Sequence, residues 1–114
     1  AGIGALSALG LKCLDYNKNP IKFPSPSTWS EIHEFDSSTL LDLPPIRIAC
    51  DVDNTLLGPE GSTRRFGPQK GLSLEVEVNR MESRMEQLVT SLAQVFPNAI
   101  EKLSIKGSGA AGVR

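Results

Sequence analysis

Two carboxylates separated by a single residue are the side chains in this sequence best suited to chemistry. Asp51 and Asp53 directly follow the apolar run IRIAC (46–50), and Asn54 comes next. Residues two apart on a strand project to the same side, so a strand over 46–52 would bring both carboxylates to one face of its tip. Such a pair could attack a phosphoryl group, hold a cation or serve another purpose, and the flanking residues must decide.

The pattern DxDxT, formed by Asp51, Asp53 and Thr55, is typical of haloacid-dehalogenase-type phosphatases, in which the first aspartate is the nucleophile. That chemistry also requires a later Ser or Thr at a strand end, a lysine and a late acidic pair for Mg²⁺. No aspartate follows Asp53, and the later glutamates cluster on a predicted helix where we expect solvent exposure. A phosphatase that uses Asp51 is therefore an alternative that rests on a short motif.

A calcium loop of the EF-hand type is excluded. A loop that begins at Asp51 needs glycine at its sixth position and a carboxylate at its twelfth. Leu56 and Ser62 stand there instead.

A longer stretch, ACDVDNTLLGPEGSTRRFGPQKG (49–71), closely resembles the signature of bacterial-type glycerate kinases. In that family, ACDVDN-Pro-Leu-x-Gly-Pro is followed by small residues and then by FGPQKG. AGIGALSALG (1–10) is similar to the end of the family's glycine-rich segment, and GSGAAG (107–112) resembles its GAGAAGG turn. The resemblance covers essentially the whole chain and is faintest between 17 and 45.

The resemblance implies transfer of the γ-phosphoryl group of ATP to a hydroxyl of glycerate, usually to give 2-phosphoglycerate. Such a site must hold Mg²⁺, neutralise phosphate charge and align the hydroxyl. The implied metal ligands or proton acceptors are Asp51 and Asp53. Asn54 and Gln69 are the implied substrate contacts, and Lys70 is implied for both catalysis and substrate binding.

The glycines of the C-terminal turn are the implied site for the nucleotide. Gly107, Gly109 and Gly112 could form a nest of backbone N–H groups for phosphate oxygens. The sequence departs from the family pattern at Thr55, where proline is usual, and at Arg64 and Arg65, which replace small or apolar residues.

Composition narrows the possible partners. The chain has 114 residues and a formal net charge of −1, with lysines and arginines scattered, so we expect no nucleic-acid partner. No apolar stretch approaches about 18 residues, so we expect no membrane span. Cys13 and Cys50 lie in separate apolar runs without CxxC spacing, which favours buried, reduced thiols and a cytoplasmic protein.

The order of predicted elements is that of an α/β protein. We predict helices within 2–10, 28–36 and 73–96, the last capped by Ser73 and ended by Pro97, with a long loop over 54–72. Strands are predicted over 12–16 and 46–52 and from 103.

Family members are longer and contain two α/β domains with the active site between them. Residues 1–114 are therefore expected to be a partial glycerate kinase domain truncated at both ends, mostly the smaller domain. The remainder of the parent chain would be its partner, and the isolated fragment is expected to be inactive. A degenerate, non-catalytic remnant is the other alternative.

Overall fold

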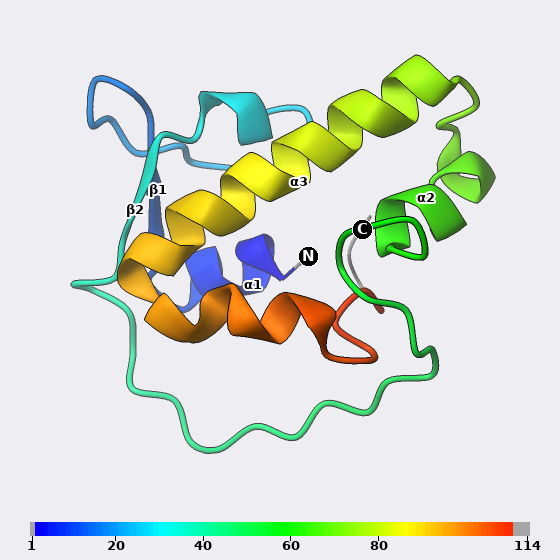
Figure 1. Ribbon diagram of the computed structural model, residues 1–114. Helices are drawn as coiled ribbons and strands as arrows, with labels where there is room; N and C mark the ends of the chain where they lie inside the picture. The colour runs from blue at the N-terminus through cyan, green and yellow to red at the C-terminus, as the bar shows by residue number, and fades with distance from the viewer. Residues whose placement is uncertain (1, 111–114) are drawn as a thin grey trace.

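The protein is described by a computed structural model that covers residues 2–110, and its longest element is helix α3, Glu75–Val95 (Figure 1). Met85 and Leu88, which are three residues apart on one face of the helix, are buried. The predicted cap at Ser73 is wrong, because the helix begins two residues later and the Leu74 N–H donates to Glu77 Oε2 at 3.3 Å. The helix ends as expected before Pro97.

The N-terminal predictions are confirmed. Helix α1 spans Ile3–Ala8, and strand β1 spans Lys12–Leu14. Gly10 lies between them with φ 108°, a left-handed backbone conformation that favours glycine. A Cβ at Gly10 would also collide with the carbonyl oxygen of Thr39.

The helix predicted over 28–36 is only partly present. A single 3₁₀ turn, η1 (Trp29–Glu31), is followed by strand β2 (Glu34–Asp36), which pairs antiparallel with β1 and sets Phe35 opposite Cys13. Trp29 and Phe35 are both buried. The prediction failed because these few apolar residues fit either period, and pairing with β1 selected the strand.

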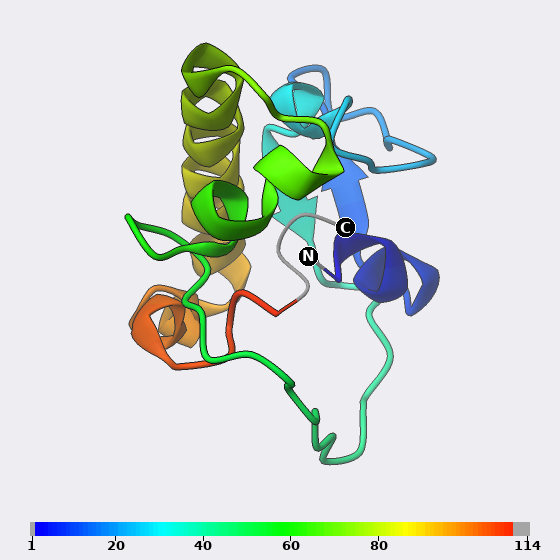
Figure 2. The ribbon, with the colours of Figure 1, turned by 90° about the vertical axis from the view of Figure 1, so that its right-hand side faces the viewer.

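The strand predicted over 46–52 is wrong. Residues 41–50 are all exposed and belong to no strand, and the segment swings out below the helices as an open loop (Figures 1 and 2). The strand predicted from 103 is also wrong, because 3₁₀ helices η3 (Pro97–Ala99) and η4 (Glu101–Ser104) occupy this region. A strand needs a neighbour to bond with its backbone, and local sequence does not say whether one is present.

The core lies between α3, the two-stranded sheet and α1, on one side of the long helix. Its buried members are Ile3, Leu11, Cys13, Trp29, Phe35, Met85 and Leu88. Helices and a small sheet thus share one core, in agreement with the predicted α/β class. None of the helices in residues 2–110 is both long enough and apolar enough to cross a bilayer.

Candidate active site

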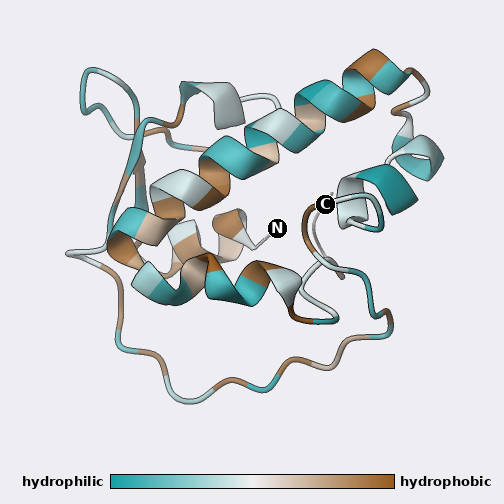
Figure 3. Cartoon of the chain, viewed as in Figure 1, coloured by the Kyte–Doolittle hydropathy of each residue, from teal (hydrophilic) through white to brown (hydrophobic). Residues whose placement is uncertain are grey.

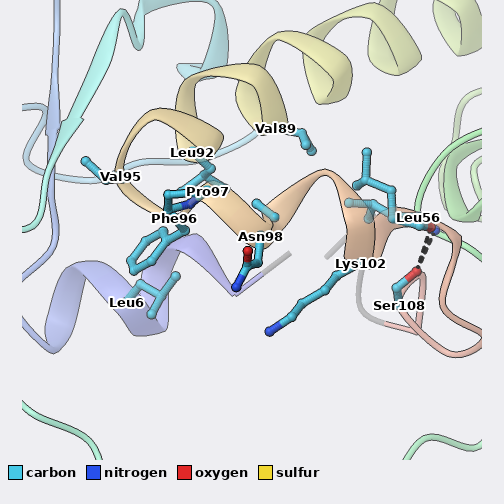
Figure 4. A pocket seen from close by; sticks show the side chains of 12 residues that line it. Leu6, Leu56, Val89, Leu92, Val95, Phe96, Pro97, Asn98, Lys102 and Ser108 are labelled. Carbon is cyan, nitrogen blue, oxygen red and sulfur yellow. Dashed lines mark hydrogen bonds between the residues drawn. The ribbon is translucent and has the colours of Figure 1, made fainter.

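The segment that carries Asp53 and Asn54 lies against the C-terminal glycine turn. The N–H of Gly109 donates to the carbonyl oxygen of Asn54 at 2.9 Å. A second bond joins the same two segments, because the N–H of Leu56 donates to Ser108 Oγ at 3.1 Å (Figure 4). The fold therefore brings together two of the motifs predicted to form the site, although they are more than 50 residues apart in the sequence.

Glycine is required in this turn because the turn lies very close to the backbone of the segment that carries the aspartates. A Cβ at Gly109 would collide with the carbonyl oxygen of Thr55, and Gly107 has φ 86° with its Cβ position 3.1 Å from that of Cys50. The N–H groups of 108, 109 and 110 donate to carbonyl oxygens within the protein. In this arrangement the turn serves packing, and its role toward phosphate stays a prediction. Gly112 lies outside the described residues.

The two aspartates are exposed, and Asn54 is half-buried. Asp51 sits at a bend and not at the tip of a strand, so the geometry that would align the two carboxylates on a strand is absent. The side-chain amide of Asn54 donates to the carbonyl oxygen of Glu60 at 2.9 Å, which folds the following loop back on itself.

The donor chemistry of this segment fits Mg²⁺. The ion usually takes one or two carboxylates from a protein and completes its shell with water and substrate phosphate oxygens. Asp51 and Asp53 provide two carboxylates. Between residues 2 and 110, no group of three or more acidic, histidine or cysteine side chains gathers as a protein-only metal cage.

The loop after Asn54 is compact and bonded to itself. Thr55 Oγ1 donates to the carbonyl oxygen of Leu57 at 2.8 Å, and the Gly61 N–H donates to that of Gly58 at 2.9 Å. The Ser62 N–H donates to the carbonyl oxygen of Thr55 at 3.0 Å. Thr55, which departs from the family pattern, supplies a hydroxyl bond that proline could not make.

Glu82 is a residue that the sequence analysis missed. It is 6% exposed, although the glutamates of α3 were expected to face solvent, so that expectation is wrong here. Glu82 Oε1 accepts a hydrogen bond from the Gly58 N–H at 2.8 Å, and Oε2 is buried without a partner among the described residues. Its spacing was a usable signal, because Glu82 follows Val78 by four and precedes Met85 by three on the apolar face.

The prediction of a loop without regular structure over 54–72 is wrong in its second half, which contains two short helices. Helix α2 (Ser62–Phe66) leads into the stretch FGPQKG, and the 3₁₀ helix η2 (Pro68–Lys70) lies within it. Gln69 and Lys70 are exposed at the end of η2, and Gly71 follows with φ 96°. The two side chains are therefore carried on a short turn of helix that α2 holds near the start of α3 (Figure 1).

Arg64 lies on the exposed side of α2. Its Nη2 donates to Asn79 Oδ1 of α3 at 3.1 Å. This arginine therefore has a structural partner, in addition to any contact with phosphate or carboxylate.

The two cysteines differ in their surroundings. Cys13 is buried as predicted, and burial raises the pKa of its thiol. Cys50 is exposed, so its predicted burial is wrong, and both thiols are unbridged.

An apolar pocket of about 500 Å³ lies beside the site, between α1, the end of α3 and η3–η4 (Figure 4). Leu6, Leu92 and Phe96 line it, and Ser108 is at its rim near Leu56. None of the predicted catalytic residues lines this pocket. The pocket is therefore adjacent to the candidate active site but is not part of it.

Comparison with known proteins identifies the relatives of this chain. Residues 1–113 match the model of the glycerate kinase family. The chain is 37% identical to glycerate 2-kinase of Escherichia coli (strain K12) and 35% identical to glycerate kinase of Bacillus subtilis (strain 168). Each alignment covers 97% of this chain and 29% of the relative.

A solved structure agrees with these matches. It is the crystal structure of a Salmonella typhimurium LT2 protein provisionally assigned as glycerate kinase 2, with a TM-score of 0.82 and 31% identity. The superposition covers 98% of this chain and 30% of that one. The chain thus spans less than a third of the length of the relatives it matches, and it belongs to the glycerate kinase family.

Proposed function

We propose that this chain is part of a glycerate kinase that transfers the γ-phosphoryl group of ATP to glycerate and forms 2-phosphoglycerate. The match of residues 1–113 to the family carries the proposal. The contact between Asn54 and Gly109, which joins two predicted site motifs, supports it.

The proposed roles follow from exposure and charge. Asp51 and Asp53 hold Mg²⁺ or accept the proton of the glycerate hydroxyl, because both carboxylates are exposed beside the glycine turn. Bound Mg²⁺ would neutralise charge on the phosphates. Asn54 contacts substrate with the part of its amide that does not bind Glu60.

The second set of roles belongs to η2 and the glycine turn. Lys70 places a positive charge that attracts phosphate or the glycerate carboxylate, and Gln69 donates to substrate. In this proposal the nucleotide phosphates approach backbone that carries no side chains, at Gly107, Gly109 and Gly112. Because the N–H of Gly109 already bonds to Asn54, binding of phosphate there requires the turn to rearrange.

The proposed unit of activity is the parent protein. Residues 1–114 form a partial domain, mostly the smaller of two, and the remainder of the parent completes the cleft. A cleft that has only one of its two sides cannot exclude water or align the phosphoryl donor and acceptor. The isolated chain should therefore be inactive. We place the parent in the cytoplasm, which the two unbridged cysteines favour.

The decisive assay gives the parent protein ATP, Mg²⁺ and glycerate and identifies the phosphoglycerate formed. We expect 2-phosphoglycerate, formed only when ATP is present. Release of phosphate from phosphomonoesters without ATP would instead support the phosphatase alternative. A parent without either activity would support the non-catalytic remnant.

A further inference from the structure

Glu82 is the one charged side chain among residues 2–110 that the fold buries, with 6% of its surface exposed. Hydrophobic and hydrophilic residues interleave along α3 (Figure 3), and Glu82 shares the buried face of this helix with Val78 and Met85. Its Oε2 has no hydrogen-bond partner among the described residues. A buried polar atom without a partner costs free energy that an apolar side chain would not, so packing alone does not account for this carboxylate.

The carboxylate holds the loop that follows the two aspartates. Glu82 Oε1 accepts a hydrogen bond from the Gly58 N–H at 2.8 Å, across 24 residues of sequence. Gly58 has φ 98°, a left-handed conformation that glycine adopts at sharp reversals of the backbone. Hydrogen bonds to a charged acceptor are stronger than those between neutral groups, so this bond anchors the loop to α3.

Hydrogen bonds at the base of the loop couple Gly58 to the aspartate segment. The Asn54 side-chain amide donates to the carbonyl oxygen of Glu60 at 2.9 Å. Ser62 Oγ donates to the carbonyl oxygen of Leu56 at 3.1 Å. Gly58 lies at the middle of this closed loop. A displacement of Gly58 would therefore also displace Asn54 and the two aspartates that precede it.

The same loop contacts the C-terminal glycine turn. The Gly109 N–H donates to the carbonyl oxygen of Asn54 at 2.9 Å, and the Leu56 N–H donates to Ser108 Oγ at 3.1 Å. The anchor to α3 therefore affects the placement of two predicted site motifs, the aspartate segment and the glycine turn.

We propose that Glu82 is a positioning residue for phosphoryl transfer, which holds Gly58 and thereby fixes the backbone of Asp53 and Asn54 against the glycine turn. The inference rests on the proposed function of the parent protein. Glu82 acts through Gly58 and is not itself a contact of substrate. A displacement of about 1 Å at a reacting group can lower a rate about 100-fold, so an anchor of this kind can matter as much as a direct contact.

Two variants of the parent protein test this role. Glu82→Met keeps an unbranched side chain of similar size and removes the acceptor for the Gly58 N–H, whereas Glu82→Gln keeps an acceptor oxygen. We expect Glu82→Met to lower kcat at least about tenfold, with KM for ATP within about threefold of the wild type. Glu82→Gln should retain kcat within about threefold.

Met85→Ala is the control for a purely structural effect. It removes buried packing from the same face of α3 and leaves the bond between Glu82 and Gly58 in place. Assayed below its melting temperature, Met85→Ala should keep kcat within about threefold of the wild type. An equal loss of kcat in Met85→Ala and Glu82→Met would overturn the proposal, because lower stability would then explain both.

Hydrogen exchange of the parent supplies a readout that does not depend on activity. Amides of 54–62 should exchange at least about tenfold faster in Glu82→Met than in the wild type, and Glu82→Gln should restore most of the protection. Unchanged exchange in Glu82→Met would overturn the anchoring of the loop.

Failure of this inference is distinguishable from failure of the proposed function. A wild-type parent that forms no phosphoglycerate would refute the proposed function and, with it, the role of Glu82 in that reaction. An active parent whose Glu82→Met variant turns over at the wild-type rate would refute the positioning role alone.

Discussion

At the scale of single residues, Gly109 lies where any side chain would collide with the segment that follows the two aspartates. We predict that Gly109→Ala lowers the free energy of unfolding by about 1–3 kcal/mol, because the new methyl group meets the carbonyl oxygen of Thr55. Gly4→Ala is the matched control, since no atom lies within 4 Å of its Cβ position. Alanine within α1 should stabilise the chain by about 0.5–1 kcal/mol, as chemical denaturation would measure. Equal effects of the two variants would contradict the packing role of Gly109.

Glu82 gives a second prediction at this scale. Glu82→Ala leaves the Gly58 N–H without its acceptor and should cost about 1–3 kcal/mol in denaturant unfolding. Glu82→Gln keeps an acceptor oxygen and should recover part of that loss. The Gly58 amide should also exchange faster in Glu82→Ala than in Glu82→Gln. Identical exchange in the two variants would mean that the carboxylate does not hold the loop.

The two thiols should react at different rates. Because burial raises the pKa of the Cys13 thiol, the reactive thiolate is disfavoured there, whereas Cys50 is exposed. A thiol reagent at pH 8 should label Cys50 first and Cys13 only after unfolding, as mass spectrometry of peptides would show. Since the unfolded state loses the Cys13 proton at lower pH, this thiol also makes stability fall as the pH rises above 9.0. Equal labelling of both cysteines in the native chain would contradict the burial of Cys13.

At the scale of elements, α3 supports the rest of the chain through its buried face. Met85 is fully buried in the core, so Met85→Ala should cost about 2–5 kcal/mol. Gln87→Ala is the control on the exposed side of the same helix and should change stability by less than about 0.5 kcal/mol. Thermal unfolding of both variants would measure the difference. A small effect of Met85→Ala would show that the helix packs differently.

Local patterns predicted some elements and not others. Helices α1 and α3 were predictable because the spacing of Ile3 and Leu6, or of Met85 and Leu88, is itself the packing face. The strand at 46–52 was not, since strand formation depends on a partner remote in sequence or absent from the chain. The site shows the same division. The motif residues were visible in the sequence, whereas the bond from Gly109 to Asn54 and the burial of Glu82 depend on tertiary structure.

At the scale of the whole molecule, the chain is a well-packed body with one incomplete surface. Its core joins α1, the sheet and α3, but the aspartates and Lys70 remain exposed and the 41–50 segment is uncovered. The relatives are more than three times as long, as the 29% coverage implies. This arrangement agrees with the proposal that the chain is part of a longer kinase.

The central claim is that the exposed aspartates act in phosphoryl transfer to glycerate by the parent protein. The most direct test is the rate of ATP-dependent 2-phosphoglycerate formation by the parent, by its Asp53→Asn variant and by a control, Glu101→Gln, that changes an exposed carboxylate of η4. We expect Asp53→Asn to lower kcat at least about 100-fold and Glu101→Gln to leave it unchanged. An Asp53→Asn parent that turns over at the wild-type rate would contradict the account.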